Sequence, residues 1–151
     1  MNTNKTEAPK KKSIVPVIIV LALFLLAGSA LMRFANNTGN RRIEGAMKGK
    51  LSAMRGAIQA YYQDNGRFPD NLEALTAGHK YLDEIPMAWT GAESLSARTR
   101  HKPSNEVVYY PRLEYHDTGK WAYVTAGPDK GSFFVDCTHT DINGYSCWTQ
   151  F

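Results

Sequence analysis

The stretch Gln59–Leu75, "QAYYQDNGRFPDNLEAL", is the most informative part of the sequence about the fold, because a long helical pattern ends within it and a shorter one begins. The paired residues Tyr61 and Tyr62 close the first pattern. The Asp-Asn-Gly that follows is turn chemistry, in which Gly66 can supply the positive φ of a helix stop. We predict that the two tyrosines pack the end of the first helix against a small β-rich head.

The second helical pattern restarts directly after the turn. Phe68 precedes Pro69, and a residue before proline favours extended backbone. Asp70 is then placed to cap a short helix over residues 71–77, with Glu73 as the reciprocal capping partner.

Upstream of the tyrosines, residues 41–63 are predicted to form an amphipathic helix. Apolar residues recur there every three or four positions, which places them on one stripe. We interpret the centre of the stripe as a helix-packing surface. Its members are Ile43, Met47, Leu51, Met54 and Ile58.

Three glycines interrupt this helical pattern, and each costs a helix about 1 kcal/mol relative to alanine. Close packing of Gly45, Gly49 and Gly56 against a neighbouring backbone would compensate for that cost. Fraying of the helix before Leu51 is the alternative. The run Asn36–Asn40 also disfavours helix, so we expect a break there.

An uncharged apolar segment, Ile14–Met32, precedes this region. A helix of that length spans roughly 28 Å, close to the hydrocarbon thickness of a bilayer. We predict a transmembrane helix over residues 13–34, after a cytoplasmic tail of residues 1–12. Small residues at the end of the apolar run also fit a cleaved signal peptide, and that alternative stays open.

The charge distribution argues against a nucleic-acid-binding protein. The chain carries a formal net charge of +4, but residues 1–34 contain five of the 18 basic residues and one of the 14 acidic residues. Residues 35–151 are therefore balanced, and the excess charge flanks the apolar segment.

Residues 35–151 are predicted to form an ectodomain of the α+β class. After the amphipathic helix, residues 64–105 read as a helix and loop region. In residues 106–151, apolar and polar residues alternate with a period of two, and turn residues occur at 116–119 and 126–131. This pattern predicts a small antiparallel sheet, including a strand at 113–115 and a short terminal strand ending in Trp148.

The two cysteines, Cys137 and Cys147, bracket a polar turn. An even pair in a small exported domain predicts a disulfide, which also favours a head outside the cytoplasm. Unpaired thiols are the alternative. A zinc site of Cys137, His139 and Cys147 is sterically possible, but it lacks an evident fourth ligand.

No arrangement of residues predicts catalysis. The four histidines are scattered over loops, and Cys137 with His139 is weak support for a nucleophile. Calcium is possible in the oxygen-rich C-terminal region, although the same residues are common in turns. These residues are Asp129, Asp136, Thr138, Thr140, Asp141 and Asn143.

The junction "KGKLSAMRGAIQAYYQDNGRFPDNLEALTAGHKYLDEIP" resembles the helix-to-head junction of type IV pilins and type II secretion pseudopilins. The C-terminal "GKWAYVTAGPDKGSFFVDCTHTDINGYSCW" is loosely similar to their terminal β-hairpins. The resemblance implies one long helix packed on an antiparallel sheet, and filaments built by bundled N-terminal helices. It also makes a calcium site in the C-terminal loop more plausible, without assigning ligands. The N-terminus differs from the family, because "SIVPVIIVLALF" after Lys12 has neither the glycine of a prepilin peptidase site nor the glutamate.

Together these observations favour a structural subunit rather than an enzyme. We expect a pilin-like subunit of a pilus or secretion system, anchored in the inner membrane by a single pass, with a cytoplasmic N-terminus and a periplasmic or extracellular head. Its expected partners are the membrane and other pilin-like subunits, with no nucleic acid or small-molecule substrate. A monomeric membrane-anchored binding module is the alternative.

Overall fold

The structure is a computed structural model that describes residues 15–90, 101–141 and 144–151. The predicted tail of residues 1–12 and part of the loop between 88 and 105 lie outside these residues. The chain divides into two compact units, Met1–Ala35 and Asn36–Phe151. The second unit is called the head below.

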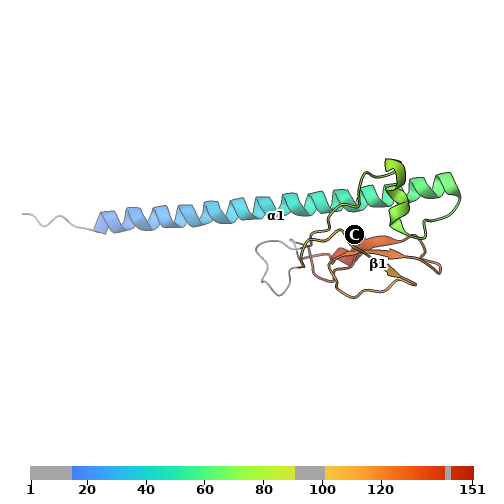
Figure 1. Cartoon of the computed structure of the whole chain (residues 1–151). Coiled ribbons are helices and arrows are strands. Elements are labelled where there is room, and N and C mark those ends of the chain that lie inside the picture. Colours follow the sequence, from blue (N-terminus) through green and yellow to red (C-terminus); the bar gives the residue numbers. More distant parts are fainter. Residues whose placement is uncertain (1–14, 91–100, 142–143) are drawn as a thin grey trace, which may run out of the picture. The chain divides into compact units, whose positions relative to one another are not determined.

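One α-helix, α1, runs from Val15 to Asn65 (Figure 1). The predicted break at Asn36–Asn40 is wrong, because these residues are helical and the two expected helices are one. The physical reason is cooperativity. Extending an existing helix through weak helix formers costs a fraction of a kcal/mol per residue, or about 1 for glycine, whereas starting a second helix requires a new nucleus.

Within the head, α1 packs on one face of the sheet from Met47 to Ile58 (Figure 1). The buried side chains of this helix fall at the spacing of a single stripe. Burying each of these large apolar side chains contributes about 1.5–3 kcal/mol. They are Met47, Leu51, Met54 and Ile58, each at most 2% exposed, and they share a core with Trp121, Tyr123 and Phe133.

The helix ends as predicted at Gly66, which has φ +69° and donates its N–H to the Tyr62 carbonyl at 2.8 Å. Two short 3₁₀ helices follow instead of one α-helix: η1, Leu72–Leu75, and η2, Ala77–His79. The cap is Asn71, whose side chain accepts from the Ala74 N–H at 3.2 Å. The prediction that Asp70 is the cap is therefore wrong.

The sheet has three strands in the order β1-β2-β3: β1, Val107–Tyr110, β2, Trp121–Val124, and β3, Phe133–Val135. β2 and β3 are antiparallel and are joined by the predicted turn at 126–131. β1 and β2 are parallel, with Val107 opposite Trp121. The prediction of an antiparallel sheet is therefore wrong for this pair.

The parallel pairing follows from the path of the chain between β1 and β2. Residues 113–115 form no strand and residues 116–119 form no hairpin, contrary to both predictions. Residues 111–120 instead cross over the second face of the sheet, where the Tyr115 and Phe134 rings lie 5.2 Å apart. A crossover returns the chain to the same end of the sheet, and parallel pairing requires this.

The C-terminal residues end in a 3₁₀ helix, η3, Trp148–Gln150, rather than in the predicted strand. A single bridge pairs Thr140 with Cys147. Arg55 on α1 donates to the carbonyl of Phe133 at 2.8 Å and to the carbonyl of Phe151. The end of the chain is thereby attached to the helix and to β3.

Candidate functional site

The predicted helix-packing residues lie inside the head. Met47, Leu51 and Met54 are at most 2% exposed, and they pack in a core with residues of the sheet of the same chain. They therefore cannot contact a second subunit while the head is folded.

The paired tyrosines both contact the segment that follows the helix. The rings of Tyr61 and Tyr81 lie 5.6 Å apart, and those of Tyr62 and Phe68 lie 4.6 Å apart. Tyr61 also packs on the main core, whereas Tyr62 is 41% exposed. The two residues thus hold the turn and the first 3₁₀ helices against the end of α1.

The face of α1 opposite the core carries the three glycines of the amphipathic region. Gly45, Gly49 and Gly56 are exposed and are spaced by four and seven residues, which places them on one face. An added Cβ at any of them would meet nothing within 4 Å. No close packing within the described head therefore accounts for these glycines.

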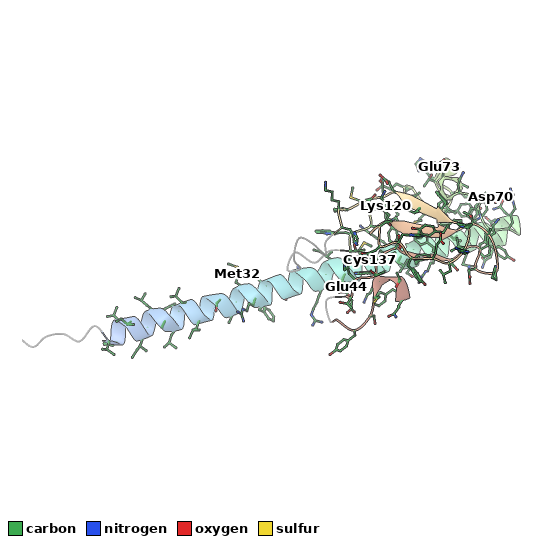
Figure 2. All side chains as sticks on the ribbon, turned by 90° about the horizontal axis from the view of Figure 1, so that it is seen from below. Met32, Glu44, Asp70, Glu73, Lys120 and Cys137 are labelled. Carbon is green, nitrogen blue, oxygen red and sulfur yellow. The ribbon has the colours of Figure 1, made fainter. Side chains whose placement is uncertain are left out.

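The N-terminal unit contains one helical segment, Val15–Ala35, that is long and apolar enough to cross a membrane. Its large apolar side chains are exposed; Phe24 is 73% exposed and Met32 is 67% exposed. Side chains project from this part of the helix in Figure 2, where Met32 is labelled. Such a length of exposed apolar surface is unfavourable in water and favourable in a bilayer.

Both cysteines are free thiols, so the expected disulfide is not formed. The backbone pairing explains why. Cys147 is bridged to Thr140, whereas the carbonyl of Cys137 accepts from the Thr149 N–H at 3.2 Å. Cys137 lies fully buried within the head (Figure 2), and its sulfur faces His139 Nδ1 at 3.4 Å.

The buried thiol belongs to a cluster of four potential metal ligands: His101, Asp117, Cys137 and His139. One ligand atom from each residue lies within 4.8 Å of all the others. Among the residues that the structure describes, it is the one such group of three or more His, Cys, Asp or Glu side chains.

Four of the separations between these donor atoms are similar to one another. His139 Nδ1 lies 3.2 Å from His101 Nε2, 3.4 Å from Cys137 Sγ and 3.7 Å from Asp117 Oδ1. Asp117 Oδ1 lies 3.4 Å from His101 Nε2. The side chain of His101 is 18% exposed, and those of His139 and Asp117 are 25% and 38% exposed.

Asp117 is held in place by its backbone and by a neighbour. It has a positive φ of +56°, which is uncommon outside glycine. Its Oδ1 atom accepts from the Thr138 N–H at 2.8 Å. Burial raises the pKa of Asp117, but the hydrogen bonds from Thr138 and the nearby histidines outweigh it, and the pKa lies below its ordinary value.

The loop that presents Asp117 is fastened to Asp136, which is fully buried directly after β3. The Asp136 carboxylate accepts from the backbone N–H groups of His116, Asp117 and Thr118 at 2.8, 3.1 and 3.2 Å. It also accepts from the hydroxyls of Thr118 and Tyr110 at 2.7 and 2.9 Å. Burial raises the pKa of Asp136, but these hydrogen bonds outweigh it and the pKa is lowered.

His101 approaches the same loop at a glycine. A Cβ added to Gly119 would lie 2.1 Å from His101 Cγ, so only glycine leaves room for the imidazole there. Gly119 also has φ +72° and donates its N–H to the Asp136 carbonyl at 2.7 Å. The loop at Gly119 therefore packs closely against the imidazole of His101.

Cys137 is not an activated nucleophile. Burial raises the pKa of the Cys137 thiol to about 11, so at neutral pH it is protonated unless a cation binds it. The pair of Cys137 and His139 considered from the sequence is thus in contact, but it lacks the low pKa that cysteine catalysis requires.

The zinc site considered from the sequence comprised Cys137, His139 and Cys147. The cluster contains the first two but not Cys147, and the sequence reasoning missed His101 and Asp117. His101 comes from the loop before β1 and lies 38 residues before His139 in the sequence. Asp117 comes from the loop before β2 and lies 21 residues before Thr138. The one available signal was Gly119 after a His-Asp-Thr turn, and this pattern is equally typical of a hairpin.

The oxygen ligands considered for calcium are already engaged in several cases. Asp136 accepts the five hydrogen bonds described above. Asp141 accepts from the Tyr145 N–H at 3.2 Å and lies 3.8 Å from Lys48 Nζ. Asn143 lies outside the described residues.

A groove of about 470 Å³ lies on the head, lined by residues of α1, the crossover and the turn before β3. Two cations at its edge have partners within the chain: Arg55 donates to Phe133, and Lys130 pairs with Asp70 at 3.2 Å.

No family model, curated protein or solved structure matches this sequence.

Proposed function

We propose that this chain is a structural subunit of a pilus-like or pseudopilus-like assembly in the bacterial cell envelope, and that it acts by helix packing. The observation that carries the proposal is the single helix α1, Val15–Asn65, whose N-terminal part is apolar and exposed. A bilayer covers such a segment before assembly, and neighbouring helices cover it within a fibre.

The glycine face supports the same function. Small residues allow two helices to approach closely, and their cost to helix stability is offset when a second helix packs there. Gly45, Gly49 and Gly56 form such a face on the side of α1 that the sheet leaves open. We infer that this face, rather than the buried stripe at Met47, Leu51 and Met54, contacts the next subunit.

The proposed location is the inner membrane, with residues 1–12 in the cytoplasm and the head in the periplasm or outside the cell. This orientation rests on the pilin-like junction at "AYYQDNGRFP". The free cysteines remove the support that a disulfide would have given.

The experiment places a photo-crosslinking amino acid at Ser52, which is exposed and lies between Gly49 and Gly56 on α1. Crosslinked oligomers are expected in native membranes. A crosslinker at Glu73, which is exposed on η1, serves as the control position.

The matched variants are Gly49→Leu and Glu73→Leu, in chains that carry the crosslinker at Ser52. We expect Gly49→Leu to abolish the oligomers and Glu73→Leu to preserve them. Gly49→Leu should leave the head folded, because Gly49 is exposed and an added Cβ would meet nothing within 4 Å. Absence of oligomers in the unsubstituted chain would instead favour a monomeric membrane-anchored module. Persistence of the oligomers in Gly49→Leu would show that the subunits do not meet at the glycine face.

A further inference from the structure

We propose that the head binds one Zn²⁺ ion through His101, Asp117, Cys137 and His139. These four residues supply two imidazole nitrogens, one carboxylate oxygen and one sulfur from three separate segments of the head. Four protein ligands complete a tetrahedral zinc sphere, which is the arrangement of structural sites.

Four of the six separations between the donor atoms are close to those of a tetrahedral zinc sphere. With bonds of about 2.0 Å from zinc to nitrogen or oxygen and about 2.3 Å to sulfur, neighbouring ligand atoms lie roughly 3.3–3.5 Å apart. The four measured separations run from 3.2 to 3.7 Å, and every remaining pair is within 4.8 Å. The side chains are therefore already close to the positions that a bound ion would require.

Hydrogen bonds alone account poorly for this convergence. His139 Nδ1 faces three polar atoms at 3.2, 3.4 and 3.7 Å, from His101, Cys137 and Asp117. A ring nitrogen has one proton or one lone pair, so it makes one good hydrogen bond at a time. A shared cation interacts favourably with all four donors at once.

The donor types select the metal. Calcium and magnesium prefer sets composed of oxygen, whereas this set contains a thiol and two imidazoles. Zinc accepts sulfur, nitrogen and carboxylate oxygen together. Zinc also favours the thiolate, so Cys137 would bind the ion as the deprotonated group.

Neighbouring contacts orient two of the ligands. The Thr138 N–H fixes Asp117 Oδ1, and Asp136 fastens the loop that carries Asp117. Gly119 leaves the space that His101 occupies. Such supporting contacts around a metal typically change its affinity by about 10- to 100-fold.

Zinc at this position would tie together the segment before β1, the crossover between β1 and β2, and the segment after β3. The expected disulfide would have closed the C-terminal turn alone. The metal centre would therefore cross-link more segments of the head than the disulfide would have done. Because it lies within the head, this role is independent of assembly through α1.

The test uses the full-length chain in mild detergent, stripped with EDTA, reloaded with ZnSO₄ and freed of loose metal by gel filtration. We expect one zinc per chain by mass spectrometry. Cys137→Ser and His101→Gln should lose it, with affinity weakened by more than about 100-fold. The controls Cys147→Ser and His116→Gln alter residues of the same types outside the cluster and should retain one zinc.

Two further readouts keep the test independent of whether a variant folds. Co²⁺ in the unsubstituted chain should give thiolate-to-metal absorption, which Cys147→Ser keeps. Zinc should also raise the thermal unfolding midpoint of the unsubstituted chain. An unsubstituted chain that binds no zinc, or a Cys137→Ser chain that still binds one tightly, would overturn the proposal.

Discussion

The carboxylate of Asp136 accepts a hydrogen bond of 2.9 Å from the hydroxyl of Tyr110. Tyr110 is the last residue of β1, and Asp136 is the first residue after β3, so the bond joins the two outer strands across β2. The same carboxylate fastens the crossover at residues 116–118. One buried carboxylate thus links β1, the crossover and the end of β3, and it positions Asp117.

Replacing Asp136 with asparagine should strongly destabilise the head. An amide has one acceptor oxygen, so at least one of the buried donors around it loses its partner, and each such loss costs about 1–3 kcal/mol. Urea unfolding followed by the fluorescence of the buried Trp121 measures the change. Asp129→Asn, an exposed acid in the turn before β3, should stay within about 0.5 kcal/mol of the unsubstituted chain.

The pH dependence of stability should reflect the lowered pKa of Asp136. A carboxyl whose folded pKa lies below its unfolded value, about 3.9, stabilises the head above that value. The contribution is lost as the pH falls from there through the folded pKa. With EDTA present, the unfolding midpoint of the unsubstituted chain should drop below pH 4 more steeply than that of Asp136→Asn. Parallel curves would show that Asp136 is not the responsible group.

Alanine at Gly119 should both destabilise the head and weaken zinc binding, because its Cβ would collide with the ring of His101. Gly127→Ala provides the matched control. Gly127 has a similar φ of +75°, but its nearest non-neighbouring atom lies 4.0 Å away. The control therefore carries the backbone strain alone, about 1–2 kcal/mol. Equal losses of stability in the two variants, with equal zinc affinity, would contradict the fit between Gly119 and His101.

Met54→Ala should destabilise the head by about 2–5 kcal/mol, because it leaves a cavity in the main core. Met87→Ala changes the same residue type at a site that is 54% exposed and should have little effect. Thermal unfolding of both variants distinguishes these outcomes. If Met54→Ala retained full stability but lost crosslinking at Ser52, the stripe would face another subunit after all.

Gly49→Ala should stabilise the isolated chain by about 0.5–1 kcal/mol, because alanine favours helix and no atom lies in its way. Dilute detergent solution, in which subunits are separate, is the condition for this measurement. A decrease in stability there would reveal a packing contact within the chain at the glycine face.

Local patterns predicted the elements that depend on neighbouring residues. The apolar segment, the buried stripe at Met47 and Met54, the stop at Gly66 and the turn at 126–131 follow from spacing and turn chemistry. The break at Asn36–Asn40 failed as a prediction because residue propensities are small beside the cost of starting a second helix.

The parallel pairing and the metal cluster depend on residues that are distant in sequence. Nothing in the turn at 116–119 shows that a carboxylate twenty residues away binds its N–H groups. In the same way, His101 and His139 are 38 residues apart in the sequence, and only the folded sheet brings them together. The disulfide failed as a prediction because the backbone pairs Cys147 with Thr140.

The position of Asp136 in the chain also bears on how the head is made on the ribosome. The crossover is synthesised about twenty residues before Asp136, whose carboxylate accepts its hydrogen bonds. β1 is synthesised earlier still. Because the β2–β3 hairpin closes a short loop, we expect it to form before β1 docks on it. A nascent chain that stalls before residue 136 lacks the carboxylate that binds Tyr110 and the crossover, so we expect aggregation to be most frequent in this interval.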